Sequence, residues 1–314
     1  MAGENLVAIG RSRYLYNAII HLHAAGFVFK AIFTEEAYDE YDIKHTDFEA
    51  LAQSVGARFY LTRDLYTDEV CELIEKNHIR VAISANWKYT IPQKFLNLFE
   101  CGILNFHLGN LPDYKGNATV NWTIINGEPF INGNIHKMDP QLDAGDIITR
   151  KKIAITADLY IQDILKKAEA MAPKLYEVAL KKVFTNPNAY EVQGSVHGLR
   201  CYPRLPEDNQ IDWNETALTC YNLVRASAHP YKGAFSFLNN EKVIIWKAEI
   251  QISEDAFLAM PGHVIAIEKK TGSILVACKS GILRIAEIEI NGLKMPATDW
   301  VKSIRVRFKF KYDV

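Results

Sequence analysis

Leu6-Val7-Ala8-Ile9-Gly10 is a short apolar run that ends at a glycine. A stretch with helical spacing of its apolar residues follows from Leu15 to Leu22, and a second apolar run covers residues 27–33. Short runs that are apolar throughout are typical of strands buried on both faces of a parallel sheet. This stretch therefore predicts the first strand, helix and strand of a parallel βαβ unit.

The alternation of apolar runs and helical patterns continues up to Phe99. Strands are predicted at residues 58–61 and 81–84, and helices near residues 48–55, 68–77 and 92–99. Strands that alternate with helices in this way predict an α/β domain with a Rossmann-like parallel sheet that is covered on both faces.

The pattern changes after Gly102. Strands are predicted at residues 103–106, 133–138 and 147–155, with a helix at residues 119–125. Thr156 is a suitable N-cap for a long helix that extends to Phe184, and Pro173 should kink or interrupt that helix. Residues 193–208 show neither the helical nor the strand periodicity of apolar residues, and they are predicted to be a linker.

Beyond the linker the sequence predicts mainly β-structure. Short strands separated by Asn, Gly and Lys turns are predicted at residues 233–238, 242–250, 263–268, 273–278 and 283–290, after one helix at residues 215–227. Short strands of this number predict a small β-barrel, of the OB type. We therefore expect two domains, an α/β domain at residues 1–200 and a smaller OB-like domain at residues 205–314.

The composition is that of an ordinary folded protein. Of 314 residues, 49% are hydrophobic and 23% are charged, and the net charge of −1 gives no general electrostatic reason to bind nucleic acid. The N-terminal residues do not resemble a secretory signal, and no apolar run is long enough to span a membrane. The five scattered cysteines form no CxxC pair. We expect a cytoplasmic protein with reduced thiols and no membrane partner.

Two common kinds of ligand site are not supported by the sequence. The first strand is followed by Gly10-Arg11-Ser12-Arg13, which holds only one of the glycines of a dinucleotide-binding loop. His21 and His23 lie two apart on a predicted helix, so they point to different faces and cannot chelate one metal together. Nicotinamide, flavin and metal cofactors are therefore not expected.

The clearest chemical signal comes from a strand end and two loops. Asn105 and His107 are two residues apart near the end of a predicted strand, so their side chains share one face. In an open α/β sheet, ligands bind at that end of the strands. A glycine-containing loop follows at residues 108–117, and Asp143 lies in a later turn.

An amide, an imidazole and a carboxylate together suit acyl transfer to an amine. The imidazole can remove a proton from the amine, and the carboxylate can orient the imidazole and stabilise its charge. The amide N–H can bind the developing oxyanion. No Ser or Cys is placed to act as nucleophile, which favours direct transfer over a covalent acyl-enzyme. From spacing alone a structural interpretation stays open, in which Asn105 and His107 cap a strand and Asp143 and Asp146 form a turn.

Three motifs, in their order and spacing, resemble the signature of the 10-formyltetrahydrofolate-dependent formyltransferases. They are Asn105-Phe106-His107 (N-x-H), Leu111 to Gly116 (LPxYKG) and Leu142 to Asp146 (LDxGD). Pro230 to Phe235 resembles part of the second domain of that family, most of all in the enzyme that formylates 4-aminoarabinose for lipid A. His107 to Pro112 resembles the sugar-nucleotide N-formyltransferases.

The resemblance implies an enzyme whose catalytic residues are Asn105, His107 and Asp143. It also implies 10-formyltetrahydrofolate as the formyl donor, bound with its acceptor by the α/β domain. The folate contacts of the family fall on Tyr89, Thr90, Ile91, Asn117, Asp139, Pro140, Gln141, Leu142 and Asp143.

The acceptor that the resemblance favours is the amino group of a dTDP-, UDP- or GDP-linked amino sugar, used for surface polysaccharide such as O-antigen. The main alternative is methionyl-tRNA, but the acidic loop Glu35 to Asp42 stands where the tRNA enzymes carry a basic insertion, so no nucleic-acid partner is expected. Arg11, Arg13 and Lys115 are candidates to bind the diphosphate, and Tyr114 could stack on a ring. A homodimer is expected, since the sugar enzymes commonly dimerise.

Other interpretations remain open at the level of the sequence. The acceptor could be another small amine, such as glycinamide ribonucleotide or a modified nonulosonic acid. The chain could also be a folate- or carbohydrate-binding regulator without turnover, or a hydrolase that deformylates the folate with water. Turnover with any amine excludes the regulator, and release of formate without an acceptor supports the hydrolase.

Overall fold

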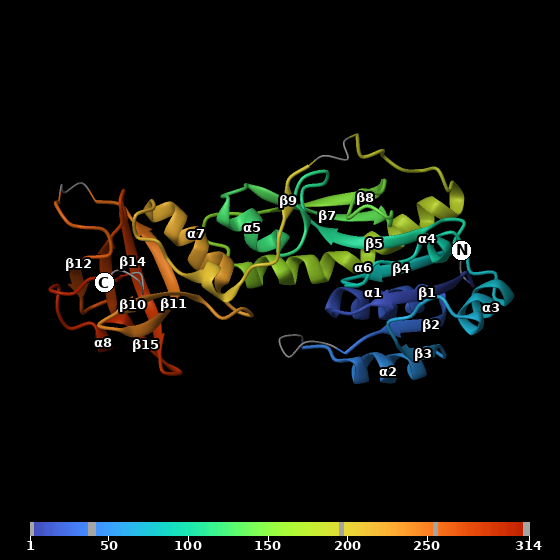
Figure 1. The fold of residues 1–314 in the computed structure, drawn as a ribbon, viewed down its shortest axis with the longest axis horizontal. Helices are drawn as coiled ribbons and strands as arrows, with labels where there is room; N and C mark the ends of the chain where they lie inside the picture. The colour runs from blue at the N-terminus through green and yellow to red at the C-terminus, as the bar shows by residue number, and fades with distance from the viewer. Residues whose placement is uncertain (1–2, 37–41, 195–197, 254–256, 310–314) are drawn as a thin grey trace. The chain divides into compact units, whose positions relative to one another are not determined.

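The computed structural model describes residues 3–36, 42–194, 198–253 and 257–309, which form two compact units (Figure 1). Unit 1 contains residues 1–119, 130–154 and 164–201. Unit 2 contains residues 120–129, 155–163 and 202–314.

The chain enters unit 2 twice before residue 202, whereas the sequence suggested a single boundary between residues 200 and 205. Helix α7 (Ala217–Ser227) explains the difference. Nη1 of its Arg225 donates hydrogen bonds to the carbonyl oxygens of Thr156 at 3.1 Å and Leu159 at 2.8 Å. Its Tyr221 hydroxyl donates to the carbonyl of Ala157 at 2.8 Å, so these earlier residues are bound to unit 2 by contacts that sequence patterns do not reveal.

Unit 1 is built on a seven-stranded sheet in the order β3-β2-β1-β4-β5-β7-β8. Its strands are β1 (Asn5–Gly10), β2 (Val28–Thr34), β3 (Arg58–Leu61), β4 (Val81–Ala85), β5 (Ile103–Leu108), β7 (Phe130–Lys137) and β8 (Ile147–Ala154). Strands β1 to β5 are parallel, as predicted, but β7 and β8 are antiparallel to their neighbours. Residues 138–146 connect β7 to β8, and a connection this short suits an antiparallel hairpin rather than a parallel crossover.

The helices of unit 1 pack around the buried strands of this sheet. They are α1 (Arg13–Ala24), α2 (His45–Ser54), α3 (Asp68–Lys76), α4 (Gln93–Leu96) and most of α6 (Ile161–Thr185). Leu6 to Ile9 in β1 are completely buried, and α1 buries the apolar face that its spacing predicts. Strand β1 lies between β2 and β4, so the winding reverses there, and open α/β sheets bind ligands at the carboxyl ends of such strands.

Helix α6 differs from its prediction in two respects. It begins at Ile161 rather than after Thr156, because Asp163 Oδ2 accepts a hydrogen bond from the Tyr160 backbone N–H at 2.9 Å and so caps the helix there. It also continues through Pro173 without interruption. Ala172 and Tyr176 on either side are fully buried, and their packing stabilises the helix where the proline removes a backbone hydrogen bond.

Part of the predicted linker belongs to unit 1. Arg200–Cys201 forms β9, which pairs in parallel with β6 (Lys115–Gly116). Asp113 Oδ1 also accepts a hydrogen bond from the Leu199 backbone N–H at 2.8 Å. The loop that carries the LPxYKG motif is therefore bound to a segment more than eighty residues later in the chain.

Unit 2 contains an antiparallel sheet in the order β10-β11-β14-β13-β12, with β15 paired to β14. The strands are β10 (Ala234–Leu238), β11 (Glu241–Gln251), β12 (Val264–Glu268), β13 (Ser273–Ala277), β14 (Ile282–Ile290) and β15 (Leu293–Pro296). The helices are α5 (Thr119–Ile125), η1 (Pro206–Asn209), α7 and α8 (Ala297–Trp300). Strand β15 was not predicted from the sequence.

The two edges of this sheet are joined by residues 306–309. Lys309 and Phe237 of β10 exchange backbone hydrogen bonds of 2.9 and 3.3 Å. On the other edge, Val264 N–H donates to Val306 O at 3.2 Å and Phe308 N–H to Gly262 O at 2.8 Å. The sheet is thereby closed, in agreement with the predicted barrel, and the Phe308 side chain is buried in its core.

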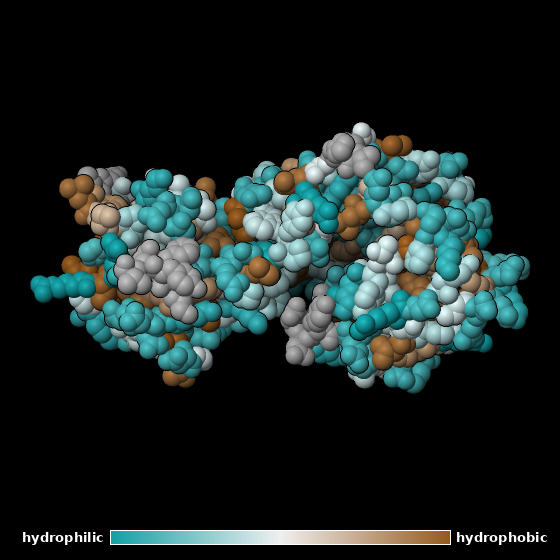
Figure 2. Space-filling model, viewed as in Figure 1, coloured by the Kyte–Doolittle hydropathy of each residue, from teal (hydrophilic) through white to brown (hydrophobic). Residues whose placement is uncertain are grey.

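Unit 2 also exposes apolar side chains between β11 and β12, at the upper left of the view in Figure 2. They include Ile252, Leu258 and Met260, which are 85%, 104% and 62% exposed. Among the described residues, no helix has the length and apolar character needed to cross a membrane.

Candidate active site

The candidate site is built on the paired strands β5 and β7. Asn105 lies opposite His136 in the antiparallel register, and His107 lies opposite Asn134. Residues that face each other across an antiparallel pair project from the same side of the sheet. The register therefore adds His136 to the face that the alternation of Asn105 and His107 predicts.

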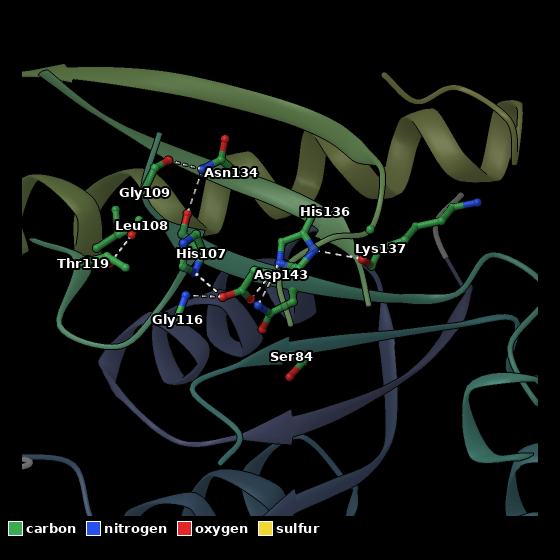
Figure 3. Close-up of polar contacts among 12 residues, drawn as sticks. Ser84, His107, Leu108, Gly109, Gly116, Thr119, Asn134, His136, Lys137 and Asp143 are labelled. Carbon is green, nitrogen blue, oxygen red and sulfur yellow. Dashed lines mark hydrogen bonds and ion pairs between the residues drawn. The ribbon is translucent and has the colours of Figure 1, made fainter. Parts of the chain in front are cut away.

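Asp143 reaches the same place from the loop between β7 and β8. Its Oδ2 accepts a hydrogen bond from the Gly116 backbone N–H at 2.8 Å and lies 3.5 Å from His107 Nδ1. Its Oδ1 lies 3.6 Å from His136 Nε2. Figure 3 shows the carboxylate between the two imidazole rings. The structure thus brings together the three residues predicted as catalytic, and a second histidine with them.

The hydrogen bonds define the protonation pattern of the His107 ring. His107 Nε2 lies 2.8 Å from the Tyr114 carbonyl oxygen, which can only accept, so Nε2 carries a proton. In the neutral ring, Nδ1 is then the nitrogen with a free lone pair, and it faces Asp143. A proton taken up at Nδ1 would be stabilised by the adjacent carboxylate.

His136 was not identified from the sequence. It is 2% exposed, its Nδ1 lies 2.9 Å from the Lys137 carbonyl oxygen, and its Nε2 lies 3.1 Å from Asn105 Nδ2. The signal that could have found it is the alternation of Asn134 and His136 in a predicted strand. That alternation gives no information on the strand to which it pairs or on the register of the pairing.

Burial and neighbouring charges set the charge state of the site. Burial alone would raise the pKa of Asp143, but His107, His136, the Gly116 N–H and Lys115 outweigh it, and the pKa is lowered below its usual value. Burial lowers the pKa of His136, and the opposing attraction of Asp143 does not restore it. At neutral pH the site therefore holds a charged Asp143 and an uncharged His136.

Two glycines allow the backbone around these side chains to come close. A Cβ on Gly109 would lie 2.6 Å from His107 Nε2 and 2.4 Å from the Tyr114 carbonyl oxygen. Gly116 has φ +96°, and a Cβ there would lie 2.5 Å from the Cys201 carbonyl oxygen. Neither position has room for a side chain, and Gly116 also adopts a backbone conformation that favours glycine.

The Asp143 loop is held by a residue from the predicted linker. Gln193 Nε2 donates to the carbonyl oxygen of Asp143 at 3.1 Å and to that of Gly145. Because one of these carbonyls belongs to Asp143 itself, Gln193 fixes the backbone from which the carboxylate projects. Sequence reasoning missed this residue, since nothing in its local pattern connects it to a loop some fifty residues earlier.

Most of the residues predicted to contact folate lie on two loops, which leave the sheet at opposite ends of β5, because β4 is parallel to β5 and β7 is antiparallel to it. Tyr89, Thr90 and Ile91 follow β4, and Trp87 packs against the same buried cluster as Met138, which follows β7. The predicted residues of the other loop, Asp139, Pro140, Gln141 and Leu142, directly precede Asp143.

These folate candidates differ in their contacts. The Tyr89 hydroxyl is buried and makes no hydrogen bond to any described residue. The Asn117 backbone N–H donates to the Cys201 carbonyl at 3.1 Å, and Asp139 Oδ1 accepts from the Gln141 N–H at 2.9 Å. Leu142 is 48% exposed, so an apolar surface is available beside Asp143.

Two of the residues predicted to bind the acceptor substrate form ion pairs with carboxylates of the chain. Arg11 lies 3.3 Å from Glu35, and Arg13 lies 2.6 Å from Asp42. Two carboxylates of the predicted acidic loop thus pair with the two arginines proposed for a diphosphate, and residues 37–41 of that loop lie outside the described residues. Lys115 and Tyr114 are buried, at 5% and 4% exposure, next to the catalytic candidates.

Metal binding finds no support in the part of the chain that the structure describes, where no group of three or more His, Cys, Asp or Glu side chains could hold an ion. An amide donor, a titratable imidazole and a carboxylate instead gather at the carboxyl edge of an α/β sheet. These groups define a site suited to acyl transfer.

Comparison with known proteins identifies the family. A family model described as formyl transferase matches residues 30–180, and one described as formyl transferase, C-terminal domain, matches residues 205–305. Together they match most of the chain. The chain belongs to the formyl transferase family, a family of formyl-transferring enzymes.

Solved structures of similar fold include other formyltransferases. The N-formyltransferase from Helicobacter canadensis, in complex with folinic acid and dTDP-3-aminofucose, is 17% identical with a TM-score of 0.65, over 91% of this chain and 100% of that one. A methionyl-tRNA formyltransferase from Clostridium thermocellum is 15% identical with a TM-score of 0.55, over 92% and 100%.

HypX from Aquifex aeolicus, in complex with tetrahydrofolic acid, is 16% identical with a TM-score of 0.62. The match covers 97% of this chain and 48% of HypX, so the chain spans about half of the length of that protein. At such identities these likenesses show the fold.

Proposed function

We propose that this protein transfers the formyl group of 10-formyltetrahydrofolate to the amino group of a nucleotide-linked amino sugar. The observation that carries the proposal is the position of the Asp143 carboxylate within 3.5 Å of His107 Nδ1, in a member of the formyl transferase family whose N-x-H motif also supplies Asn105. Unit 1 would be the catalytic domain, since all the candidate residues belong to it.

Each of the three candidate residues has a separate role in the proposed reaction. The amine nitrogen attacks the formyl carbon and loses a proton to His107 Nδ1, and the resulting imidazolium is stabilised by Asp143. Asn105 Nδ2 donates a hydrogen bond to the formyl oxygen as it becomes an oxyanion. The bond from the formyl carbon to N10 of the folate then breaks, and N10 gains a proton in place of the one that the amine lost.

The loops beside the site fit a folate. A pterin offers hydrogen-bonding groups to a buried polar atom such as the Tyr89 hydroxyl, which has no described partner, and Leu142 offers an exposed apolar surface for its ring. The fold neighbours from Helicobacter canadensis and Aquifex aeolicus were solved with folate compounds, which supports the same donor class here.

The acceptor proposal rests on charge. A tRNA acceptor requires Lys and Arg side chains that can neutralise phosphates. Arg11 forms an ion pair with Glu35, and Arg13 forms one with Asp42. The net charge of the whole chain is −1. A compact nucleotide sugar needs fewer cationic contacts, which favours the class of acceptor bound by the Helicobacter canadensis enzyme. Its product would serve the synthesis of surface polysaccharide.

The test is release of tetrahydrofolate from 10-formyltetrahydrofolate with a panel of dTDP-, UDP- and GDP-linked 3-amino and 4-amino sugars, and with methionyl-tRNA alongside. Rapid turnover of one amino sugar, lost in His107→Asn, is the expected result. Turnover of methionyl-tRNA alone would overturn the acceptor proposal. Formate release that needs no acceptor would indicate a hydrolase and overturn the transfer proposal.

A further inference from the structure

We infer that His136 is a positioning residue, which holds the side-chain amide of Asn105 in the one orientation that directs an N–H toward the formyl oxygen. The inference rests on the proposed function, because it assigns Asn105 the role of oxyanion donor. It adds a fourth residue to the three that the family motifs contain.

The direction of each hydrogen bond around His136 follows from its partners. The Lys137 carbonyl oxygen, 2.9 Å from Nδ1, can only accept, so Nδ1 carries the proton of the neutral ring. Nε2 is then left with a lone pair, and the group 3.1 Å away is the Asn105 amide. A lone pair attracts the NH₂ end of that amide and repels its oxygen.

This arrangement removes an ambiguity that an asparagine would otherwise have. An isolated Asn105 could rotate its amide and present Oδ1 to the substrate, where it would repel a developing oxyanion. With one Nδ2 hydrogen bound to His136, the second Nδ2 hydrogen remains available to the formyl oxygen. Held in this way before the substrate arrives, the donor needs no reorganisation during the reaction.

The inference requires His136 to stay uncharged beside a carboxylate. Asp143 Oδ1 lies 3.6 Å from His136 Nε2, the His107 ring centroid lies 6.2 Å from that of His136, and Lys115 is also close enough to influence its charge. Protonation would turn Nε2 into a donor, which would bind Asp143 and release the Asn105 amide. Complete burial opposes that protonation, so the two histidines that flank Asp143 have different roles.

The first test measures the ring itself and needs no activity. ¹⁵N spectra of the full chain at neutral pH, with the His136 signals assigned by their absence in His136→Gln, report which ring nitrogen is protonated. We expect the Nδ1–H form with an unprotonated Nε2. An Nε2–H form or an imidazolium would overturn the inference.

The second test compares two substitutions in the formyl transfer assay. His136→Gln keeps an acceptor oxygen near the position of Nε2, whereas His136→Leu removes it. We expect kcat to fall by ~10- to 100-fold in His136→Leu with KM unchanged for both substrates, since the lost interaction strengthens only in the transition state. His136→Gln should recover most of the rate, because its side-chain oxygen can still accept the hydrogen bond from Asn105 Nδ2.

A matched control is His263→Gln in unit 2, where His263 Nε2 lies 2.9 Å from the Ile304 carbonyl oxygen. It should leave both kcat and the pH profile unchanged. Equal rates for correctly folded His136→Leu and wild type would overturn the inference. A wild type that formylates no acceptor would instead overturn the proposed function, and if His136→Leu does not fold, the ring spectra decide.

Discussion

The two halves of the candidate site are built in different ways. Asn105, His107 and His136 project from neighbouring strands, whose ladder of backbone hydrogen bonds fixes their spacing. Asp143 and the Gly116 N–H that binds it come from loops. Those loops are held by the predicted linker, through Gln193 and through the pairing of β6 with β9.

This difference shows which side chains of the site are positioned by the strand pairing itself and which depend on contacts with distant parts of the chain. A strand pair holds its side chains by local pairing. A loop holds a catalytic group only if other residues satisfy its backbone and limit its movement. Changes in the strand half should therefore act on the chemistry, and changes in the loop half should act on the position of Asp143.

The largest effect should come from His107, the proposed general base. His107→Asn removes the ring nitrogen that is proposed to accept the proton, and the asparagine side chain is small enough for the site. Loss of a general base typically lowers the rate by ~10²- to 10⁴-fold, and we expect kcat/KM for formyl transfer to fall within that range with an unchanged thermal unfolding midpoint. An unchanged kcat/KM in the folded variant would remove His107 from the mechanism.

A test of the loop half is Gly116→Ala. The new Cβ would lie 2.5 Å from the Cys201 carbonyl at a φ of +96°, so β6 must move and carry the Asp143-binding N–H with it. Strain of this kind costs about 1–3 kcal/mol, and we expect kcat/KM to fall by ~10- to 100-fold.

The control for this variant is Gly56→Ala. Gly56 also has a positive φ, of +70°, but nothing lies within 4 Å of its Cβ position. Gly56→Ala strains the backbone at that position but displaces no neighbouring atoms, so it should leave kcat/KM unchanged. Equal losses in both variants would show that general destabilisation, and not the position of Asp143, lowers the rate.

The same comparison explains how much of the molecule the sequence could predict. Periodicity located most strands and helices, and the alternation of Asn105 and His107 placed them on one face, because both signals are local. His136 was missed because the register of β5 against β7 is a relation between two strands. Gln193 was missed because a polar residue in an irregular segment gives no sign of the distant loop to which it bonds.

The antiparallel end of the sheet and the boundaries of unit 2 were missed for the same physical reason. They depend on the hairpin connection at residues 138–146 and on the hydrogen bonds of Arg225 to Thr156 and Leu159. The charge argument was also local, since it used the acidic character of the loop from Glu35 to Asp42, although Glu35 and Asp42 each pair with an arginine.

A smaller effect is expected from Gln193→Ala. The variant removes two hydrogen bonds to the Asp143 loop but no reacting group. A hydrogen bond contributes about 1 kcal/mol, so kcat/KM should fall by ~10-fold as Asp143 becomes less well positioned. Gln251→Ala, which removes a bond to Ile252 in unit 2, should have no effect on kcat/KM. Identical kinetics in the two variants would mean that the Asp143 loop holds its position without Gln193.

The smallest effect concerns the strand half and the pH dependence of its stability. The pKa of His136 is lowered in the folded state from its usual value of 6.5, so below that pH the unfolded chain binds a proton that the folded chain does not. The stabilisation is complete above pH 6.5 and is lost as the pH falls toward the lower folded pKa. Asp143 adds a loss with the same sign only below its own usual value of 3.8, because its folded pKa is also lowered.

Hydrogen exchange of β5 and β7 measures this loss locally. Between pH 7.5 and 5.5, and after correction for the intrinsic exchange rate, protection of these strands should decrease in the wild type and stay constant in His136→Gln, while β11 in unit 2 serves as the internal reference. The expected change is small, since it comes from one group. If protection of β5 and β7 were equally constant in both proteins, His136 would take up its proton in the folded state as readily as in the unfolded chain. Neither half of the site would then lose stability between pH 7.5 and 5.5. The strand half and the loop half would not differ in their response to protonation in that range.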